Sequence, residues 1–144
     1  MASVFDVAVY ILSASGEMPA IKLHKLLYYS QAWSLVWDGK PLFPEEIQAW
    51  VNGPVVPAVY NVHKGMFKLT PGAFPQGKPD ALTEIEKESV DVVLDYYGEK
   101  SSQYLMNLVC SERPWKEARN GLPLGERGNR VIHKKALADF YGSI

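Results

Sequence analysis

Apolar positions in the N-terminal stretch recur at the spacing of an amphipathic helix. The pattern begins after Ser3, which forms a capping-box pattern with Asp6, and it ends at Gly16, a residue type that readily takes the left-handed conformation of a helix stop. An alternation typical of a strand is also present, at Phe5, Val7, Val9 and Ile11. The cap and the glycine favour a helix.

A second helix is predicted over residues 19–38, since Pro19 suits a first helical turn and Gly39 and Pro41 end the pattern. One face forms a stripe of Leu23, Leu26, Leu27, Ser30, Trp33 and Trp37. The stripe is broadened nearly all round by Tyr29, Ala32 and Val36. A helix that is apolar on most sides lies at the centre of a domain.

The middle of the chain predicts a short strand and little other regular structure. Residues 47–51 alternate between apolar and other side chains, and Asn52-Gly53-Pro54 is expected to close this strand as a turn. Pro57 can open a third helix that runs through Tyr60 and ends by Gly65. Residues 65–79 are rich in Gly and Pro and are expected to form a loop, in which residues 66–69 can form a hairpin arm.

The C-terminal half returns to helical spacing. Thr83 and Glu86 form a second capping-box pattern at the head of a helix that ends near Gly98. Further helices are expected from Ser102, over 114–119 and over 133–141, with a loop at 122–129. The prediction is a mainly α fold: one compact helical bundle of residues 1–144 around a central aromatic-rich helix, with a minor short β element.

The length and composition fit one globular domain, with 47% hydrophobic and 22% charged residues. The single cysteine, Cys110, excludes an intramolecular disulfide and favours a reducing compartment. Asp6 interrupts the first apolar run, unlike a secretory signal. The longest uncharged stretch, 47–62, contains Gly53, Pro54 and Pro57, which exclude a spanning helix. We therefore expect a cytoplasmic protein with no membrane partner.

The charges are unevenly distributed although the net charge is only −1. Residues 80–100 carry seven acids and two lysines, whereas residues 112–135 carry seven Lys or Arg and three Glu. Solvated helix faces explain such clusters, and a bipolar surface that orients a charged partner is the alternative. The net charge itself disfavours a general nucleic-acid binder.

No pattern of catalytic or metal-binding residues stands out. The histidines His24, His63 and His133 are far apart in the sequence and have no second ligand at a zinc-like spacing, so no metal and no cofactor are expected. Cys110 follows an apolar helix with no nucleophile elbow around it, which is typical of a structural cysteine. The sequence thus predicts a non-enzyme, and a Cys110-dependent hydrolase is the enzymatic alternative.

Five ordered blocks resemble the Panacea, or SocA-like, antitoxin domain. They are Leu23-x-Lys25-Leu26-Leu27-Tyr28-Tyr29-Ser30-Gln31-Ala32-Trp33, Gly39-x-Pro41-Leu42-Phe43, Ala49-Trp50-x-x-Gly53-Pro54-Val55-Val56, Glu112-Arg113-Pro114-Trp115 and Phe140-Tyr141. Together they cover most of the chain. The sequence departs from the family where Val109 and Cys110 replace a frequent Thr-His pair. Any role that depends on that histidine is in doubt for this protein.

The resemblance implies an antitoxin of a type II toxin–antitoxin pair, of the kind often carried by prophages and other mobile elements. Such a protein neutralises a toxin encoded by a neighbouring gene through direct protein contact. One branch of the family acts as a proteolytic adaptor, so a host protease is a further partner that the resemblance implies.

Two sets of residues are candidates for toxin contact. The first set lies next to turns and helix starts: Trp50, Gly53, Pro54, Tyr60 and Trp115. Core packing is the alternative for the two tryptophans, and a turn is the simplest role for the Gly-Pro pair. The second set is acidic and would occupy the basic surface of an RNA-directed toxin: Glu84, Glu88, Asp91 and Asp95.

The alternative function is a nucleic-acid-binding regulator of the protein's own operon. It is motivated by a group of basic residues, namely Arg113, Lys116, Arg119, Arg127, Arg130, Lys134 and Lys135. The net charge and the lack of a helix-turn-helix signature disfavour it.

Overall fold

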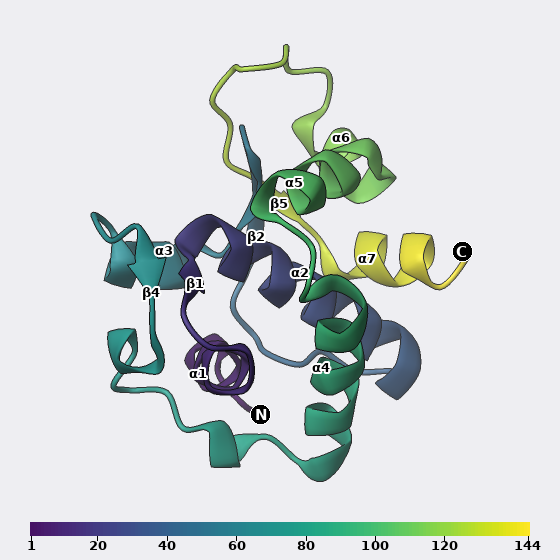
Figure 1. Ribbon diagram of the computed structural model, residues 1–144. Helices are drawn as coiled ribbons and strands as arrows, with labels where there is room; N and C mark the ends of the chain where they lie inside the picture. The colour runs from purple at the N-terminus through teal and green to yellow at the C-terminus, as the bar shows by residue number, and fades with distance from the viewer.

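The second helix, α2 (Ala20–Asp38), is the axis of the structure. In the computed structural model, which describes residues 1–144, α2 crosses the middle of the molecule (Figure 1). It packs against α1 (Val4–Ser15), α4 (Glu84–Tyr97), α5 (Ser102–Ser111) and α7 (Lys134–Tyr141). Twelve residues of α2 are buried, which confirms the expected central aromatic-rich helix.

The predicted helix ends are confirmed at both capping boxes. The Ser3 hydroxyl accepts a hydrogen bond from the Asp6 backbone N–H at 3.3 Å, and the Asp6 carboxylate accepts from the Ser3 N–H at 2.8 Å. Thr83 and Glu86 repeat this reciprocal pair at the start of α4. Each box satisfies N–H groups that the first turn of a helix leaves unpaired.

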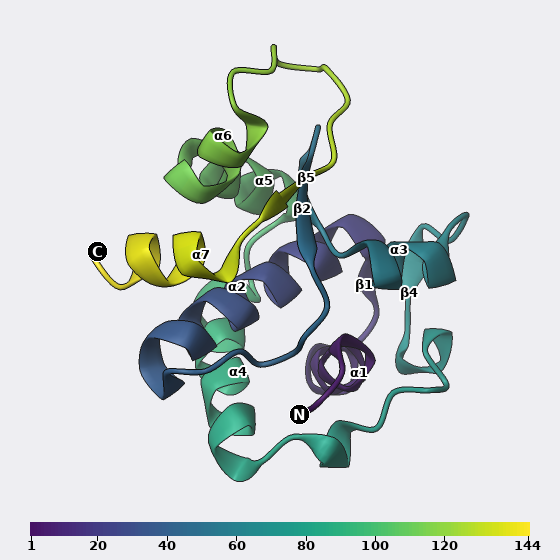
Figure 2. The same ribbon diagram turned by 180° about the vertical axis from the view of Figure 1, so that it is seen from behind.

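A three-stranded antiparallel sheet lies across one side of α2 (Figure 2). Its central strand β2 (Ile47–Trp50) pairs with β3 (Gly53–Val55) and with β5 (Arg130–Ile132). The expectation of a turn at Asn52-Gly53-Pro54 is therefore only partly right, because Gly53 and Pro54 both lie within β3, opposite Trp50 and Ala49. An edge strand tolerates proline because its outward side needs no N–H donor.

The expected hairpin arm at residues 66–69 is wrong in its pairing. β4 (Lys68–Leu69) pairs with β1 (Met18–Pro19), which directly precedes α2. The Ala20 backbone N–H also donates to the Phe67 carbonyl oxygen at 2.9 Å. The loop after α3 (Pro57–His63) is thus held against the first turn of α2. Two short 3-10 turns, Pro71–Ala73 and Pro79–Ala81, complete the segment before α4.

One apolar core holds the helices and both small sheets together. A single cluster of 33 buried apolar residues extends from Ala2 to Tyr141. Its continuity agrees with one compact, mainly helical domain with minor β structure.

Two polar side chains brace this core. The Gln31 amide accepts from the Leu42 N–H at 2.7 Å and donates to the Phe43 carbonyl at 2.8 Å, which fixes the segment after α2. Glu112, at the junction of α5 and α6 (Arg113–Arg119), accepts from the hydroxyls of Tyr29 at 2.7 Å and Tyr141 at 2.8 Å. These bonds explain structurally why the sequence has Gln and Glu in two of the ordered blocks.

Candidate functional site

The turn between β2 and β3 covers a buried lysine of α2. Gly53 has a φ of +120°, and a Cβ at this position would lie 3.0 Å from the Lys25 Cε and 3.3 Å from its Nζ. Glycine therefore serves two purposes here: it permits the backbone conformation and it leaves room for the amine beneath the turn. Pro54, the next residue, is buried in the same strand.

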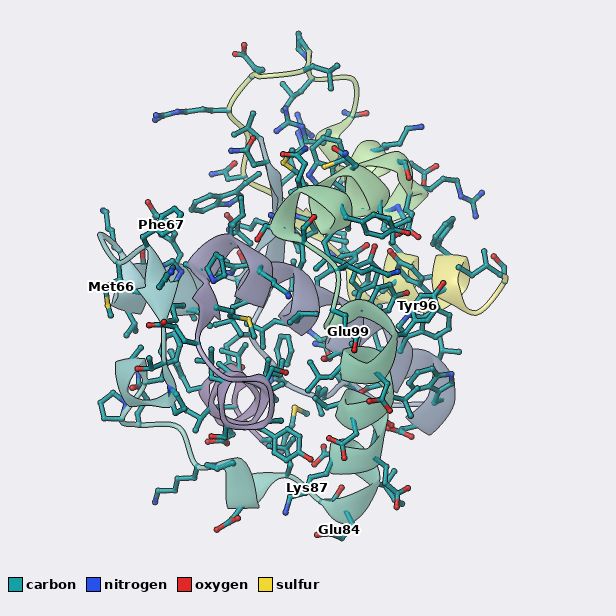
Figure 3. All side chains as sticks on the ribbon, viewed as in Figure 1. Met66, Phe67, Glu84, Lys87, Tyr96 and Glu99 are labelled. Carbon is teal, nitrogen blue, oxygen red and sulfur yellow. The ribbon has the colours of Figure 1, made fainter.

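An apolar groove opens beside this turn, between α2, the β2–β3 hairpin and α3. Its volume is about 320 Å³. It is lined by Ala20, Ile21, His24, Lys25, Trp50, Val51, Asn52, Val55, Tyr60, His63, Met66 and Phe67. Met66 and Phe67 protrude at the rim, with 47% and 77% of their surface exposed (Figure 3). We call this hollow the Lys25 groove.

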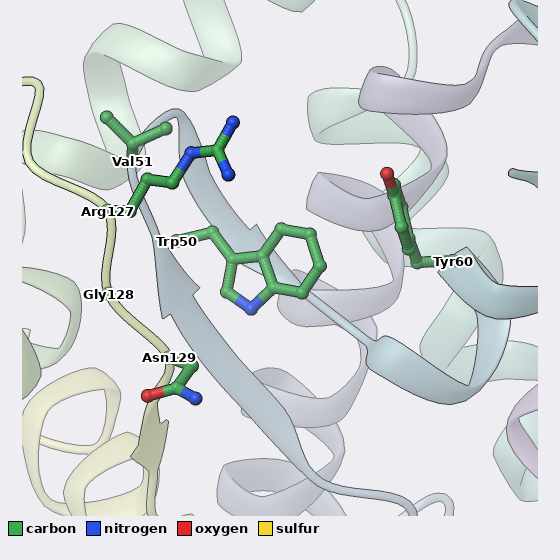
Figure 4. Close-up of a pocket in the computed structure, with 6 residues that line it drawn as sticks. All are labelled: Trp50, Val51, Tyr60, Arg127, Gly128 and Asn129. Carbon is green, nitrogen blue, oxygen red and sulfur yellow. The ribbon is translucent and has the colours of Figure 1, made fainter. Parts of the chain in front are cut away.

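A second, more open hollow shares Trp50, Val51 and Tyr60 with the Lys25 groove and continues toward the segment before β5. Its volume is about 630 Å³. Figure 4 shows the Trp50 ring pointing toward Tyr60, with Arg127 and Asn129 flanking it on the other side. We call this the Arg127 hollow.

Trp50 forms the ridge between the two hollows. Its ring meets that of Tyr60 edge-on with centroids 5.0 Å apart, and its indole N–H donates to the Gln48 amide oxygen at 2.8 Å. Trp115 is only 5% exposed, and its indole N–H donates to the Trp50 carbonyl oxygen at 2.9 Å. Trp115 therefore supports the ridge from beneath and presents little surface of its own, as the core-packing alternative anticipated.

Two of the three histidines, although far apart in the sequence, meet in the structure. The Nε2 atoms of His24 and His63 lie 2.8 Å apart in the wall of the Lys25 groove. The His24 Nδ1 accepts from the Val56 backbone N–H at 3.1 Å, which leaves its Nε2 as the donor to His63. Burial first, and then the neighbouring His63 and Lys25, lower the pKa of His24 to about 3. Burial also lowers the pKa of His63, so both rings are neutral at pH 7.

Lys25 has no acidic partner. The two ion pairs of the structure join Lys87 to Glu84 and Lys135 to Asp139, both on exposed helix faces. Burial lowers the pKa of Lys25 to about 8, which still leaves the amine mostly protonated at pH 7. The groove thus has one cationic group in an apolar wall.

Sequence reasoning did not single out Lys25 or the two histidines of the groove. One signal was present: Lys25 lies inside the apolar stretch of α2, where a charged residue is rare unless it is paired. The contact with His63 had no local signal, because His24 and His63 lie 39 residues apart in the sequence, on different helices.

The acidic candidates lie on a different part of the surface. Glu84, Glu88, Asp91 and Asp95 are all exposed along α4. Asp91 accepts from the Tyr10 hydroxyl of α1 at 2.8 Å, so part of this acidic face is fixed against α1. The α4 acids therefore do not join the groups around Trp50, as the separation of Glu84 from Phe67 in Figure 3 shows.

Several of the basic residues behind the nucleic-acid alternative are engaged within the chain. Arg119 is 3% exposed, stacks over the Trp115 ring and donates to the Glu126 carbonyl at 2.6 Å. Lys135 pairs with Asp139 at 2.7 Å, and Arg113 lies over the Phe140 ring. They do not form one free basic face.

Cys110 is half-buried at the end of α5. Burial raises the pKa of its thiol, and the nearby Lys25 and Arg119 offset this only in part. A raised pKa keeps the sulfur protonated at pH 7, which disfavours the hydrolase alternative because the thiolate is the nucleophile.

No group of three or more His, Cys, Asp or Glu side chains is arranged to hold a metal ion. None of the helices combines the length and the apolar character needed to cross a bilayer.

The fold and these hollows define a small helical domain with an aromatic, carboxylate-free concave face. The family model described as antitoxin SocA-like, Panacea domain, matches residues 23–116. The chain therefore belongs to the SocA-like antitoxin family with a Panacea domain. No curated protein and no solved structure matches the chain. Helices α1 and α7 lie outside the matched residues and pack on α2, and the extension of the domain to residues 1–144 stays a prediction.

Family membership bears on the activity of the protein. An antitoxin-like family favours a non-catalytic role and implies a toxin partner in general terms. The ordered blocks that suggested the family meet around α2 in the structure. Lys25 of the first block lies beneath Gly53 of the third, and Trp115 of the fourth binds Trp50.

Proposed function

We propose that this protein is the antitoxin of a type II toxin–antitoxin pair and neutralises a toxin encoded by a neighbouring gene through direct contact. The observation that carries the proposal is the concave face around Trp50, within a domain of an antitoxin family. Aromatic side chains set between hollows are typical of the residues that dominate binding energy at protein interfaces. We propose that the protein acts in the cytoplasm and that its gene is carried by a prophage or another mobile element.

Trp50 and Tyr60 form the centre of the proposed contact, and Met66 and Phe67 form its rim. Apolar residues exposed together mark interaction sites more often than residues exposed singly. Gly53, Pro54 and Trp115 shape this face from below, since all three are buried. Of the candidate residues predicted from the sequence near the β2–β3 turn, two would contact the toxin and the other three would support the contact surface.

Co-expression tests the proposal directly. The neighbouring gene product is induced alone and together with this protein, and growth is measured. We expect growth arrest in the first case and recovery in the second. A neighbour that is harmless alone, or that remains toxic in the presence of this protein, contradicts the proposal.

A matched pair of tryptophan variants locates the contact. Trp50→Ala is expected to weaken toxin binding at least about tenfold, in the range of an interface hot spot. Trp37→Ala removes an exposed tryptophan from the far end of α2 and is expected to leave binding unchanged. If the two variants weaken toxin binding equally, the toxin does not bind specifically at the hollows.

Two finer versions of the proposal are testable in the same strains. If the protein delivers its toxin to a host protease, the half-life of the toxin should shorten when the protein is present and recover when the protease gene is deleted. If the protein instead regulates its own operon, it should shift promoter DNA at moderate salt. The engagement of Arg119, Lys135 and Arg113 within the chain argues against DNA binding.

A further inference from the structure

The Lys25 groove has the chemistry of a site for a carboxylate. Lys25 is 1% exposed, yet it lines the groove, and no hydrogen bond or ion pair from within the chain reaches its amine. The other eleven lining residues include no Lys, Arg, Asp or Glu. A buried cation without a partner costs free energy of folding, so this arrangement is not explained by stability.

The structure makes specific room for the amine. A Cβ on Gly53 would lie 3.0 Å from the Lys25 Cε, so any larger residue at the turn would displace the lysine. The positive φ of Gly53 holds the turn over the lysine stem while the groove stays open at its side. The neighbouring His24 and His63 are hydrogen-bonded to each other through their Nε2 atoms, and burial lowers the pKa of both, so neither ring adds a positive charge; the His63 Nδ1 has no partner within the chain.

The hollow that adjoins the groove also has a cationic residue and no carboxylate in its lining. Arg127 lines the adjoining hollow, and no Asp or Glu lines either one. The buried Arg119 has one guanidinium nitrogen without a hydrogen-bond partner. An incoming negative charge therefore meets the buried Lys25 on one side of Trp50 and the exposed Arg127 on the other, and burial strengthens the interaction with Lys25.

We propose that the Lys25 groove binds a carboxylate of the toxin that is carried next to a large apolar side chain. This inference rests on the proposed antitoxin function and names the contact. The carboxylate accepts a charge-assisted hydrogen bond from the Lys25 Nζ, while the apolar side chain packs against Tyr60 and the exposed ring of Phe67. A volume of about 320 Å³, near the lower end of ligand pockets, suits one side chain with its neighbouring carboxylate.

A pair of short peptides probes the groove in the purified full-length protein without any toxin. N-acetyl-Leu-Phe is titrated as the free acid and as the C-terminal amide, and binding is followed by the chemical shifts of backbone amides around the groove. We expect the acid to bind at least about tenfold tighter than the amide, the ratio expected of one charge-assisted hydrogen bond. Equal affinities, or no saturable shifts, would overturn the proposal.

Three variants assign the effect. Lys25→Met keeps an unbranched side chain in the core and should abolish the preference for the acid. Lys68→Met removes an exposed lysine of β4 and should keep the preference. The double variant Met66→Ser and Phe67→Ser alters only the exposed rim, so it folds regardless of the core. It should weaken both peptides equally, and full affinity in this variant would contradict the assigned groove.

The toxin completes the test. Lys25→Met should lose neutralisation in co-expressing cells while Lys68→Met retains it. Substitution of each acidic residue of the toxin, and removal of its C-terminal residues, then distinguish a side-chain carboxylate from the chain end. If acid-selective peptide binding is present but Lys25→Met still neutralises, the groove binds a free carboxylate and the docking proposal is wrong. If even the unaltered protein fails to neutralise, the antitoxin proposal fails, while the peptide result still decides the groove.

Discussion

His24 and His63 contact one another in a setting that excludes their charged forms. The two rings belong to different helices, α2 and α3, and the Val56 N–H fixes the tautomer of the first. A proton added to either ring would have to replace a bond between neutral groups and would face Lys25 nearby. The pair therefore couples the packing of α3 on α2 to pH.

The stability of the fold should fall in mild acid because of this pair. Folding lowers the pKa of His24 from 6.5 to about 3. Between pH 6.5 and pH 3, His24 is therefore protonated in the unfolded chain and neutral in the folded chain. The stabilisation is complete above pH 6.5 and declines below it by up to about 1.4 kcal/mol per pH unit. Urea unfolding at pH 7.5, 6 and 5 measures this slope. His24→Gln should flatten it, whereas the exposed His133→Gln should not.

Gly53 gives a second prediction at the level of one residue. Gly53→Ala should lower the free energy of unfolding by about 1–3 kcal/mol, because the new methyl group meets Lys25 and a φ of +120° is strained for any L side chain. Gly125→Ala is the matched control, since Gly125 also has a positive φ but no atom within 4 Å of its added Cβ. Equal losses in the two variants would show that backbone strain alone matters at Gly53.

At the level of elements, Glu112 joins four helices. It ends α5 and precedes α6, and its carboxylate accepts hydroxyls from Tyr29 on α2 and Tyr141 on α7. Tyr141 also shares a hydrogen bond with the buried Tyr28 hydroxyl at 3.0 Å. Burial raises the pKa values of these three tyrosines, and the Glu112 charge adds to this, so the hydroxyls remain donors at physiological pH.

Removing this acceptor should cost more than removing a surface carboxylate. Glu112→Ala leaves two buried hydroxyls short of a partner and is expected to lower stability by about 2–4 kcal/mol. Glu112→Gln keeps an accepting oxygen and should lose about 1 kcal/mol or less. Glu117→Ala on the same helix, where the side chain is exposed, should change stability by at most about 0.5 kcal/mol. Denaturant melts of the three variants decide the matter.

At the scale of the whole molecule, two surfaces of opposite charge lie on separate elements. Lys25 and Arg127 line the two hollows around Trp50 and no Asp or Glu lines either one, while the exposed stripe of α4 carries four acids. Figure 3 places the labelled Phe67 and Glu84 at different margins of the fold. A partner large enough to touch both would be oriented by the charge pattern before it docks.

Charge reversal on α4 tests whether that stripe guides the toxin. Changing Glu84, Glu88, Asp91 and Asp95 to lysine should slow association about tenfold and weaken its dependence on salt, if the toxin has a basic surface. A control variant with the same change in net charge reverses the exposed acids Glu17, Asp80, Glu117 and Asp139. Rapid-mixing measurements compare the two, and identical rates would exclude guidance by α4.

The sequence was sufficient for elements whose signals are local. Both capping boxes, the central helix and the start of α6 at its proline follow from residues within a few positions of one another. Long-range strand pairing was not predictable in the same way: β5 and the pairing of β1 with β4 involve segments of two or three residues, too short for a periodic pattern. For the same reason the sequence placed candidate residues only at the β2–β3 turn and nearby helix starts, while the positions of Lys25 and the His24–His63 contact needed the tertiary arrangement.

The hydrogen bond from the Ala20 N–H to the Phe67 carbonyl oxygen bears on the dissociation rate of a complex formed at this face. It fixes the backbone of an exposed aromatic residue to the most buried helix of the protein, so the loop that carries the ring is ordered before any partner binds. The loop therefore loses little conformational freedom when a partner covers this ring. A loop that is ordered before binding chiefly lowers the dissociation rate, which would lengthen the residence time of a partner bound there.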